Sequence, residues 1–97
     1  MKNLEYILFT LKSKKPELEK RYALSELGVF GSYARGDADT GSDIDILVDF
    51  NKKIDAFDYI KLANELEDLF QQKIDIVSRK AIKPQYLPYV EKNLIHV

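Results

Sequence analysis

The sequence predicts a small α+β domain, in which helices pack on a mixed β-sheet. Apolar residues alternate through 43–50, as in a strand with one buried face, and recur at helical spacing through 55–71. The chain has 97 residues, a length that fits one domain spanning 1–97. A domain of this size buries a modest core, so we expect a partner or oligomer to add stability.

The other predicted elements follow from caps, breakers and short apolar runs. A first helix is expected at about 3–14 with Asn3 as its N-cap, because leucines and Ile7 recur there at helical spacing. Pro16 suits the first turn of a second, short helix that ends near Tyr22. The rest are expected at 24–30 (strand), 31–41 (glycine-rich loop, opening with a helical turn), 73–78 (strand), 86–92 (short helix) and 94–97 (extended stretch).

Composition restricts the chemistry. The chain has no cysteine and a single histidine, His96, which excludes thiolate chemistry and multi-histidine metal sites. A bound metal would therefore use oxygen ligands, as Mg²⁺ and Mn²⁺ do. A net charge of -1 gives no global basic excess for nucleic acid. No apolar run is long enough to span a membrane and no signal-peptide pattern opens the chain, so the expected location is the cytoplasm.

Asp43 and Asp45 share the polar face of the predicted strand at 43–50. Residues two apart on a strand point the same way, about 6.6 Å apart along the chain, so both carboxylates face one site. Adjacent carboxylates repel unless cations share the space, and two divalent cations about 3.5–4 Å apart suit such a pair. The alternative is a polar strand face turned to water, although aspartate is depleted in strands.

Asp75 interrupts an apolar strand between two isoleucines. Neighbouring strands lie about 4.8 Å apart, so Asp75 reaches the same cations if its strand lies beside that of Asp45. The alternative is an ordinary aspartate at a sheet edge. Asp49 lies about 13 Å beyond Asp45 along the strand, too far to share a metal, and is interpreted as a surface or structural residue.

Gly31 and Ser32 directly follow the predicted strand at 24–30. A glycine at this point lets the backbone approach a phosphate closely, and the serine hydroxyl can donate to a phosphate oxygen. Arg35 adds a charge-assisted contact to a triphosphate. Most glycine-serine pairs are simple turns, and the Gly-Lys-Ser/Thr ending of a Walker A loop is absent.

Taken together, these residues resemble a known signature. Ser32, a gap of ten residues and Asp43-Ile44-Asp45 resemble the Gly-Ser-x10-Asp-x-Asp motif of the DNA polymerase β-like nucleotidyltransferase superfamily. The short form, with its GSYARG opening, resembles the minimal nucleotidyltransferases (MNT) of bacteria and archaea, which are often the antitoxins of HEPN/MNT toxin–antitoxin pairs. The motif covers Gly31–Phe50 without departure at the signature positions. The resemblance implies a polymerase β palm-like fold, with Asp75 as the third carboxylate.

The resemblance also implies a mechanism. Two Mg²⁺ ions, or Mn²⁺ in their place, would be held by Asp43, Asp45 and Asp75, lowering the pKa of the acceptor hydroxyl and clamping the triphosphate of ATP. Gly31 and Ser32 would hold the β- and γ-phosphates. Asp75 would lie nearest the acceptor and help to take its proton.

The acceptor implied by the resemblance is a tyrosine of a cognate HEPN ribonuclease toxin, in a hetero-oligomer. AMP near a ribonuclease site adds bulk and negative charge that would repel RNA. Three alternatives stay open: an antitoxin that acts by binding alone, a transferase for a small molecule, and a transferase for nucleic acid, which the net charge disfavours. Candidate partner-contact residues, for which a place in the core is the stronger alternative, are Phe57, Tyr59, Tyr86, Leu87 and Tyr89. Residues expected on a solvated helix face are Lys61, Glu65, Glu67 and Asp68.

Overall fold

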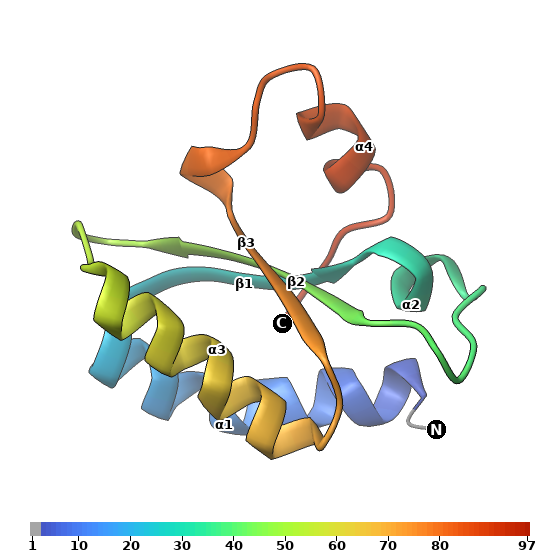
Figure 1. The fold of residues 1–97 in the computed structure, drawn as a ribbon, viewed down its shortest axis with the longest axis horizontal. Helices are drawn as coiled ribbons and strands as arrows, with labels where there is room; N and C mark the ends of the chain where they lie inside the picture. The colour runs from blue at the N-terminus through green and yellow to red at the C-terminus, as the bar shows by residue number, and fades with distance from the viewer. Residues whose placement is uncertain (1–2) are drawn as a thin grey trace.

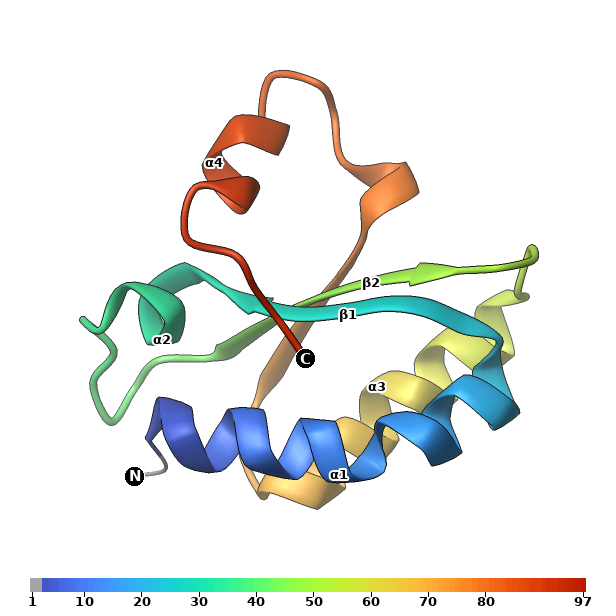
Figure 2. The same cartoon turned by 180° about the vertical axis from the view of Figure 1, so that it is seen from behind.

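The computed structural model describes residues 3–97, and its centre is a four-stranded mixed sheet (Figures 1 and 2). The strands run in the spatial order β3-β2-β1-β4. β1 is antiparallel to β2 and β4, whereas β2 and β3 are parallel. The predicted mixed sheet is therefore confirmed, with strands at Leu24–Phe30 (β1), Ile44–Phe50 (β2), Ile74–Ser78 (β3) and Ile95–His96 (β4).

Helices cover both faces of this sheet. Two long helices, α1 (Leu4–Tyr22) and α3 (Ala56–Phe70), lie together on one face, and the short helix α4 (Leu87–Glu91) lies on the other (Figure 1). A short helix α2 (Gly31–Arg35) follows β1, and a 3-10 turn η1 (Arg79–Ala81) follows β3. α3 crosses between the parallel strands β2 and β3, as a parallel connection requires.

The prediction of two helices before residue 23 is wrong, because α1 continues through Pro16 without a break. Proline removes one helical hydrogen bond, but a single apolar stripe runs along both halves of the helix and is buried against the sheet. Ile7, Leu11 and Leu18 belong to that stripe and are buried. The predicted N-cap is confirmed, since the Asn3 side chain accepts a hydrogen bond from the Tyr6 backbone N–H at 2.9 Å.

A β-bulge in β1 sets which side chains face which layer. The register of β1 against β2 shifts between Leu24 and Glu26. Leu24 and Leu27, three residues apart, therefore both enter the main core, and Glu26 faces the α4 side. The sequence pattern of β1 gave no sign of this extra residue.

The buried side chains form two clusters, one on each face of the sheet. The larger lies under α1 and α3 and includes Ile46, Leu66 and Phe70. Burial of each of these side chains stabilises the fold by about 1.5–3 kcal/mol. The smaller lies under α4 and consists of Phe30, Leu47 and Val90. The smaller cluster fixes α4 on the face to which the predicted catalytic aspartates belong.

The outer face of α3 is less solvated than predicted. Glu65 is partly buried because Arg21 of α1 forms an ion pair with it, and the Tyr22 hydroxyl donates to it at 3.2 Å.

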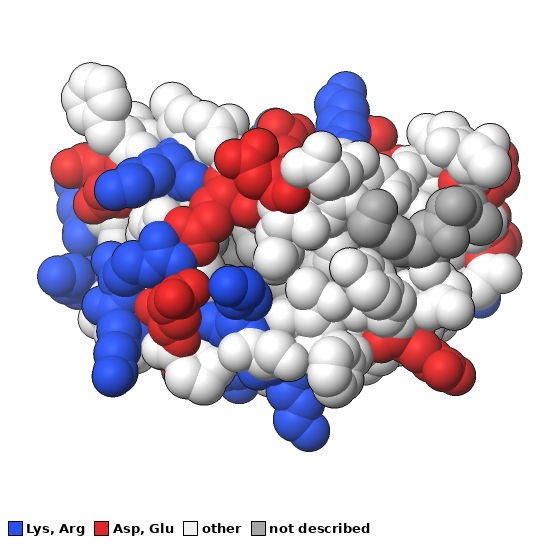
Figure 3. Space-filling model, turned by 90° about the horizontal axis from the view of Figure 1, so that it is seen from below, with Lys and Arg blue, Asp and Glu red and all other residues white. Residues whose placement is uncertain are grey.

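On the face formed by the two long helices, basic side chains gather at one end with acidic ones among them, and uncharged side chains cover much of the rest (Figure 3). Within residues 3–97, no helix combines the length and apolarity that a membrane crossing needs.

Candidate active site

Asp45 and Asp75 face each other across the parallel strands β2 and β3. The two residues are direct partners in the strand register, so their side chains leave the sheet on the same face. Adjacent strands lie about 4.8 Å apart, which brings the carboxylates within reach of one cation. The predicted neighbourhood of these two strands is thus confirmed, while the metal-binding role of the residues stays a prediction.

Asp43 lies one residue before β2, which begins at Ile44 and not at Asp43 as predicted. The Ile44 backbone N–H donates to the Lys73 carbonyl at 3.1 Å, so the starts of β2 and β3 are held together. Asp43 is close enough for its charge to act on Asp45. The three predicted ligands therefore gather at the amino ends of two parallel strands.

The carboxylate of Asp45 is electrostatically strained. Burial raises its pKa to about 6, and the negative charges of Asp75 and Asp43 act in the same direction. The charge of Arg35 opposes this shift but is the smallest contribution. A cation beside Asp45 would offset both the cost of burying its negative charge and the repulsion from the other carboxylates.

The close contact between Gly31 and Asp45 leaves no room for a larger residue at position 31. Phe30 is the register partner of Asp45 in the antiparallel pair of β1 and β2, so the next residue, Gly31, lies over that carboxylate. A Cβ atom on Gly31 would lie 1.9 Å from Asp45 Oδ2, and the backbone has a φ of +72°. Both observations require glycine here. They explain why a glycine, and not any small residue, precedes Ser32.

The turn that follows is closed by its own backbone. The Ser32 carbonyl accepts hydrogen bonds from the backbone N–H groups of Gly36 and Asp37, both at 3.0 Å. The predicted helical turn after Ser32 is confirmed as α2. Arg35, the last residue of α2, forms an ion pair with Asp37 at 3.2 Å. Arg35 thus already has an anionic partner, and its charge also acts on Asp45.

The three aspartates suit a hard divalent cation by ligand type. Carboxylate oxygens are the donors that Mg²⁺ prefers, and Asp45 and Asp75 supply a facing pair. Among residues 3–97 no three acidic or histidine side chains already converge closely enough to enclose an ion. Mutual repulsion opposes such convergence. The donor set therefore fits Mg²⁺ by ligand type, and a bound ion would draw the three carboxylates together.

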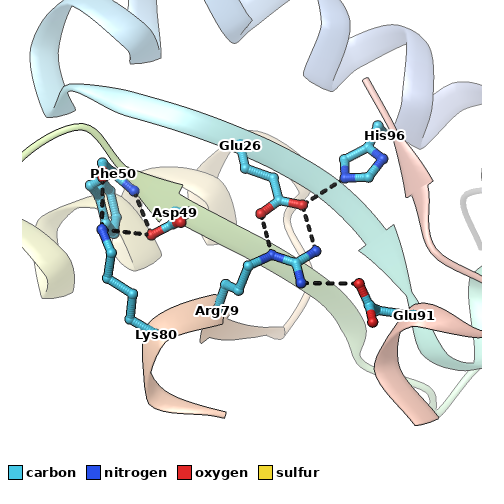
Figure 4. A network of polar contacts seen from close by, with 7 residues as sticks. All are labelled: Glu26, Asp49, Phe50, Arg79, Lys80, Glu91 and His96. Carbon is cyan, nitrogen blue, oxygen red and sulfur yellow. Dashed lines mark hydrogen bonds and ion pairs between the residues drawn. The ribbon is translucent and has the colours of Figure 1, made fainter. Parts of the chain in front are cut away.

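Two groups of contacts near the site were missed from the sequence. The Gln72 side chain donates to the Tyr33 hydroxyl at 2.6 Å and to the Ser42 carbonyl at 3.0 Å, which joins α2 to the loop before β2. On the same face as Asp45, Arg79 binds Glu26 through two hydrogen bonds of 2.6 and 2.7 Å (Figure 4). These contacts join residues 30 or more positions apart, so no local pattern reveals them.

Two hollows of the described surface lie away from the aspartates. One of about 530 Å³ lies at the opposite end of β2, where Phe50, Lys52, Tyr59 and Lys80 are among its lining residues. Another, of about 610 Å³, lies between α1 and α3. The site around Asp45 is therefore identified by its chemistry and by the Gly31 contact, not by a deep cavity.

The four-stranded sheet, with Gly31 packed against Asp45 of the facing pair, defines a polymerase β-like nucleotidyltransferase fold. Residues 11–96 match the nucleotidyltransferase domain family, and the chain belongs to that family. It is accordingly an enzyme of the nucleotidyltransferase type. The fold and family predicted from the sequence are both confirmed.

Individual relatives resemble the chain over most of its length. It is 38% identical over 97 residues to the protein adenylyltransferase MntA of Thermococcus cleftensis. This alignment covers 100% of this chain and 98% of that protein. A solved structure provisionally described as a minimal nucleotidyltransferase superimposes with a TM-score of 0.82 at 32% identity, covering 99% and 97% of the two chains. The MNT antitoxin bound to a tri-AMPylated HEPN toxin of Shewanella oneidensis matches with a TM-score of 0.68 at 20% identity, covering 92% and 69%. That last similarity is one of fold.

Proposed function

We propose that this chain transfers AMP from ATP to a tyrosine hydroxyl of a partner HEPN ribonuclease toxin and thereby acts as its antitoxin. The observation that carries the proposal is the facing pair of Asp45 and Asp75 with Gly31 packed against it. The name of the Thermococcus relative supports AMP as the transferred group and a protein as the acceptor. The description of the Shewanella complex supports a HEPN toxin as the partner.

Asp43, Asp45 and Asp75 would hold two Mg²⁺ ions, or Mn²⁺ in their place. Such ions would supply charge neutralisation for the triphosphate and lower the pKa of the acceptor hydroxyl. Asp45 would be the shared ligand, because the charges of both other carboxylates act on it.

The residues of the chain orient the reactants. Gly31 and Ser32 would bind the β- and γ-phosphates, and Arg35 would add a positive charge beside them. The acceptor oxygen would bond to the α-phosphorus as the bond to the bridging oxygen breaks and pyrophosphate leaves. Asp75 would take the proton of the incoming hydroxyl, and its exposure within the facing pair supports this role.

A second chain would supply the acceptor. Residues 3–97 fold around one sheet, and we propose that they act as one catalytic domain in a hetero-oligomer. Phe57, Tyr86 and Tyr89 are exposed and are candidate contacts for the partner, whereas Tyr59 and Leu87 are partly buried. AMP attached beside the ribonuclease site would repel RNA by its charge. The cytoplasm, which supplies ATP, is the proposed location.

Co-expression with the proposed partner tests this function. The partner's intact mass should increase by whole AMP units beside the wild-type chain, and not beside a variant that carries Asp45→Asn and Asp75→Asn. Replacing the partner's acceptor tyrosine with phenylalanine should also abolish the increase.

An unmodified partner held in a stable, inactive complex would favour the binding-only antitoxin and overturn the transfer proposal. An unmodified partner together with modification of a small hydroxylated compound would favour the small-molecule transferase. GTP in place of ATP serves as the control for the choice of nucleotide.

A further inference from the structure

The guanidinium group of Arg35 lies between an acidic and a phenolic side chain. Its Nε and Nη2 donate to the two carboxylate oxygens of Asp37 at 3.2 and 3.4 Å. Its Nη1 donates to the Tyr89 hydroxyl at 3.4 Å, across 54 positions of the sequence. Arg35 therefore links the turn after Ser32 to the helix α4.

α4 is anchored directly beside the candidate active site. Val90 packs with Phe30 and Leu47 in the smaller core cluster. Phe30 precedes Gly31, and Leu47 lies two residues after Asp45 on the same strand. The neighbouring residue Tyr89 is thus held near the phosphate-binding turn, although 66% of its surface is exposed. Packing of its ring does not explain the position of Tyr89.

The directions of the hydrogen bonds show what this group of side chains offers. Because Arg35 can only donate, the Tyr89 oxygen is the acceptor, and its hydroxyl hydrogen remains free to donate elsewhere. Within residues 3–97 the contact with Arg35 is the one hydrogen bond of that hydroxyl. A hydroxyl donor next to a guanidinium group matches an anionic oxygen of a phosphate.

The contact with Asp37 is easily replaced. Both its hydrogen bonds are long, and the Asp37 side chain is 62% exposed. Exposed ion pairs of this kind contribute little to stability. A carboxylate and a phosphate also present similar oxygens to the fork of an arginine.

We propose that Tyr89 and Arg35 together bind a terminal phosphate of the nucleoside triphosphate, and that Asp37 occupies the guanidinium group until the nucleotide replaces it. This subsite rests on the proposed function, because it presumes a triphosphate held at Gly31 and Ser32. It adds α4 to the nucleotide site. It also assigns Tyr89 to binding of the nucleoside triphosphate and not to the surface that contacts the partner.

Calorimetric binding of α,β-methylene-ATP with Mg²⁺ tests the subsite, because transfer cannot cleave this analogue between its α- and β-phosphates. Tyr89→Phe removes only the hydroxyl and should weaken binding about tenfold. Asp37→Asn removes the competing carboxylate and should strengthen binding about two- to fivefold. Tyr86→Phe is the matched control, because it removes the hydroxyl of another exposed tyrosine three residues before Tyr89, and it should leave the affinity unchanged. AMP, which lacks the terminal phosphates, should bind all four proteins alike.

Two results would overturn the subsite while leaving the proposed function intact: equal affinity of the wild type and Tyr89→Phe for the analogue, or weaker binding by Asp37→Asn. An equal loss of AMP and analogue binding in Tyr89→Phe would also overturn it, since the contact would then lie outside the terminal phosphates. Failure of the wild type to bind the analogue at all would instead contradict the proposed function itself.

Discussion

Replacing Gly31 with alanine perturbs one contact whose geometry is fully defined. The new Cβ would lie 1.9 Å from Asp45 Oδ2, and real Cβ contacts are essentially never closer than 3.0 Å. The Asp45 carboxylate must therefore move by about 1 Å, and a displacement of this size in an active site can cost about 100-fold in rate. The positive φ of +72° adds roughly 1–2 kcal/mol of backbone strain for alanine.

Gly36→Ala is the matched control for this substitution. Gly36 also has a positive φ, +87°, but a Cβ there would meet nothing within 4 Å. Both variants should lose about 1–2 kcal/mol in urea unfolding. Only Gly31→Ala should lose AMP transfer by about 100-fold per folded molecule, whereas Gly36→Ala stays within a few-fold of the wild type. Equal activity of the two variants would refute the role assigned to the contact between Gly31 and Asp45.

Three further predictions follow from charges and the backbone. Hydrogen bonds from Arg79, aided by His96 and opposed by burial, lower the pKa of Glu26 from 4.5 to about 2. The ionised Glu26 carboxylate therefore stabilises the fold by at most about 3 kcal/mol. This stabilisation is fully present above pH 4.5 and is lost as the pH falls toward 2. Urea midpoints of Glu26→Gln should lie below those of the wild type at pH 6 and converge with them near pH 2; a constant difference would contradict this. The pKa of Asp45, raised from 3.8 to about 6, destabilises the fold as the pH rises through that range. Asp45→Asn should then have a higher melting temperature than the wild type at pH 7.5 in EDTA, with a gain in stability that solvent screening keeps well below the roughly 3 kcal/mol of the full shift. It should also lose the stabilisation that added Mg²⁺ gives the wild type; equal responses to Mg²⁺ would argue against a metal ligand. Pro16→Ala restores a helical N–H inside α1 and should raise the free energy of unfolding by about 1–3 kcal/mol, seen as a higher melting temperature. A lower melting temperature would show that Pro16 stabilises α1.

Local patterns were sufficient for most of the fold. The strand at Leu24–Phe30 lies where it was predicted, and the alternating strand around Asp45 differs by one residue at its start. The helix predicted at 55–71 is observed at Ala56–Phe70. These segments have clear periodicity and caps, since Asp55 accepts a hydrogen bond from the Asp58 backbone N–H. Periodicity and capping residues together are enough to predict such elements.

Tertiary contacts were not predictable in the same way. Pro16 indicated a boundary, but burial of one continuous apolar stripe outweighed the lost hydrogen bond. The pairs of Arg79 with Glu26 and of Arg35 with Tyr89 depend on strand order and on the placement of α4. The sequence therefore indicated which residues carry the chemistry, and the fold showed that Asp45, Asp75 and Gly31 meet.

Pyrophosphate release tests the central claim most directly. Purified chain, purified HEPN partner, ATP and Mg²⁺ would be combined, and pyrophosphate, ADP and AMP bound to the partner would be measured together. We predict one pyrophosphate for each AMP attached, no ADP, and a loss of at least about 100-fold when Asp45 and Asp75 are both replaced by asparagine. Release of ADP and phosphate, or equal pyrophosphate release by the asparagine variant, would contradict AMP transfer at these aspartates.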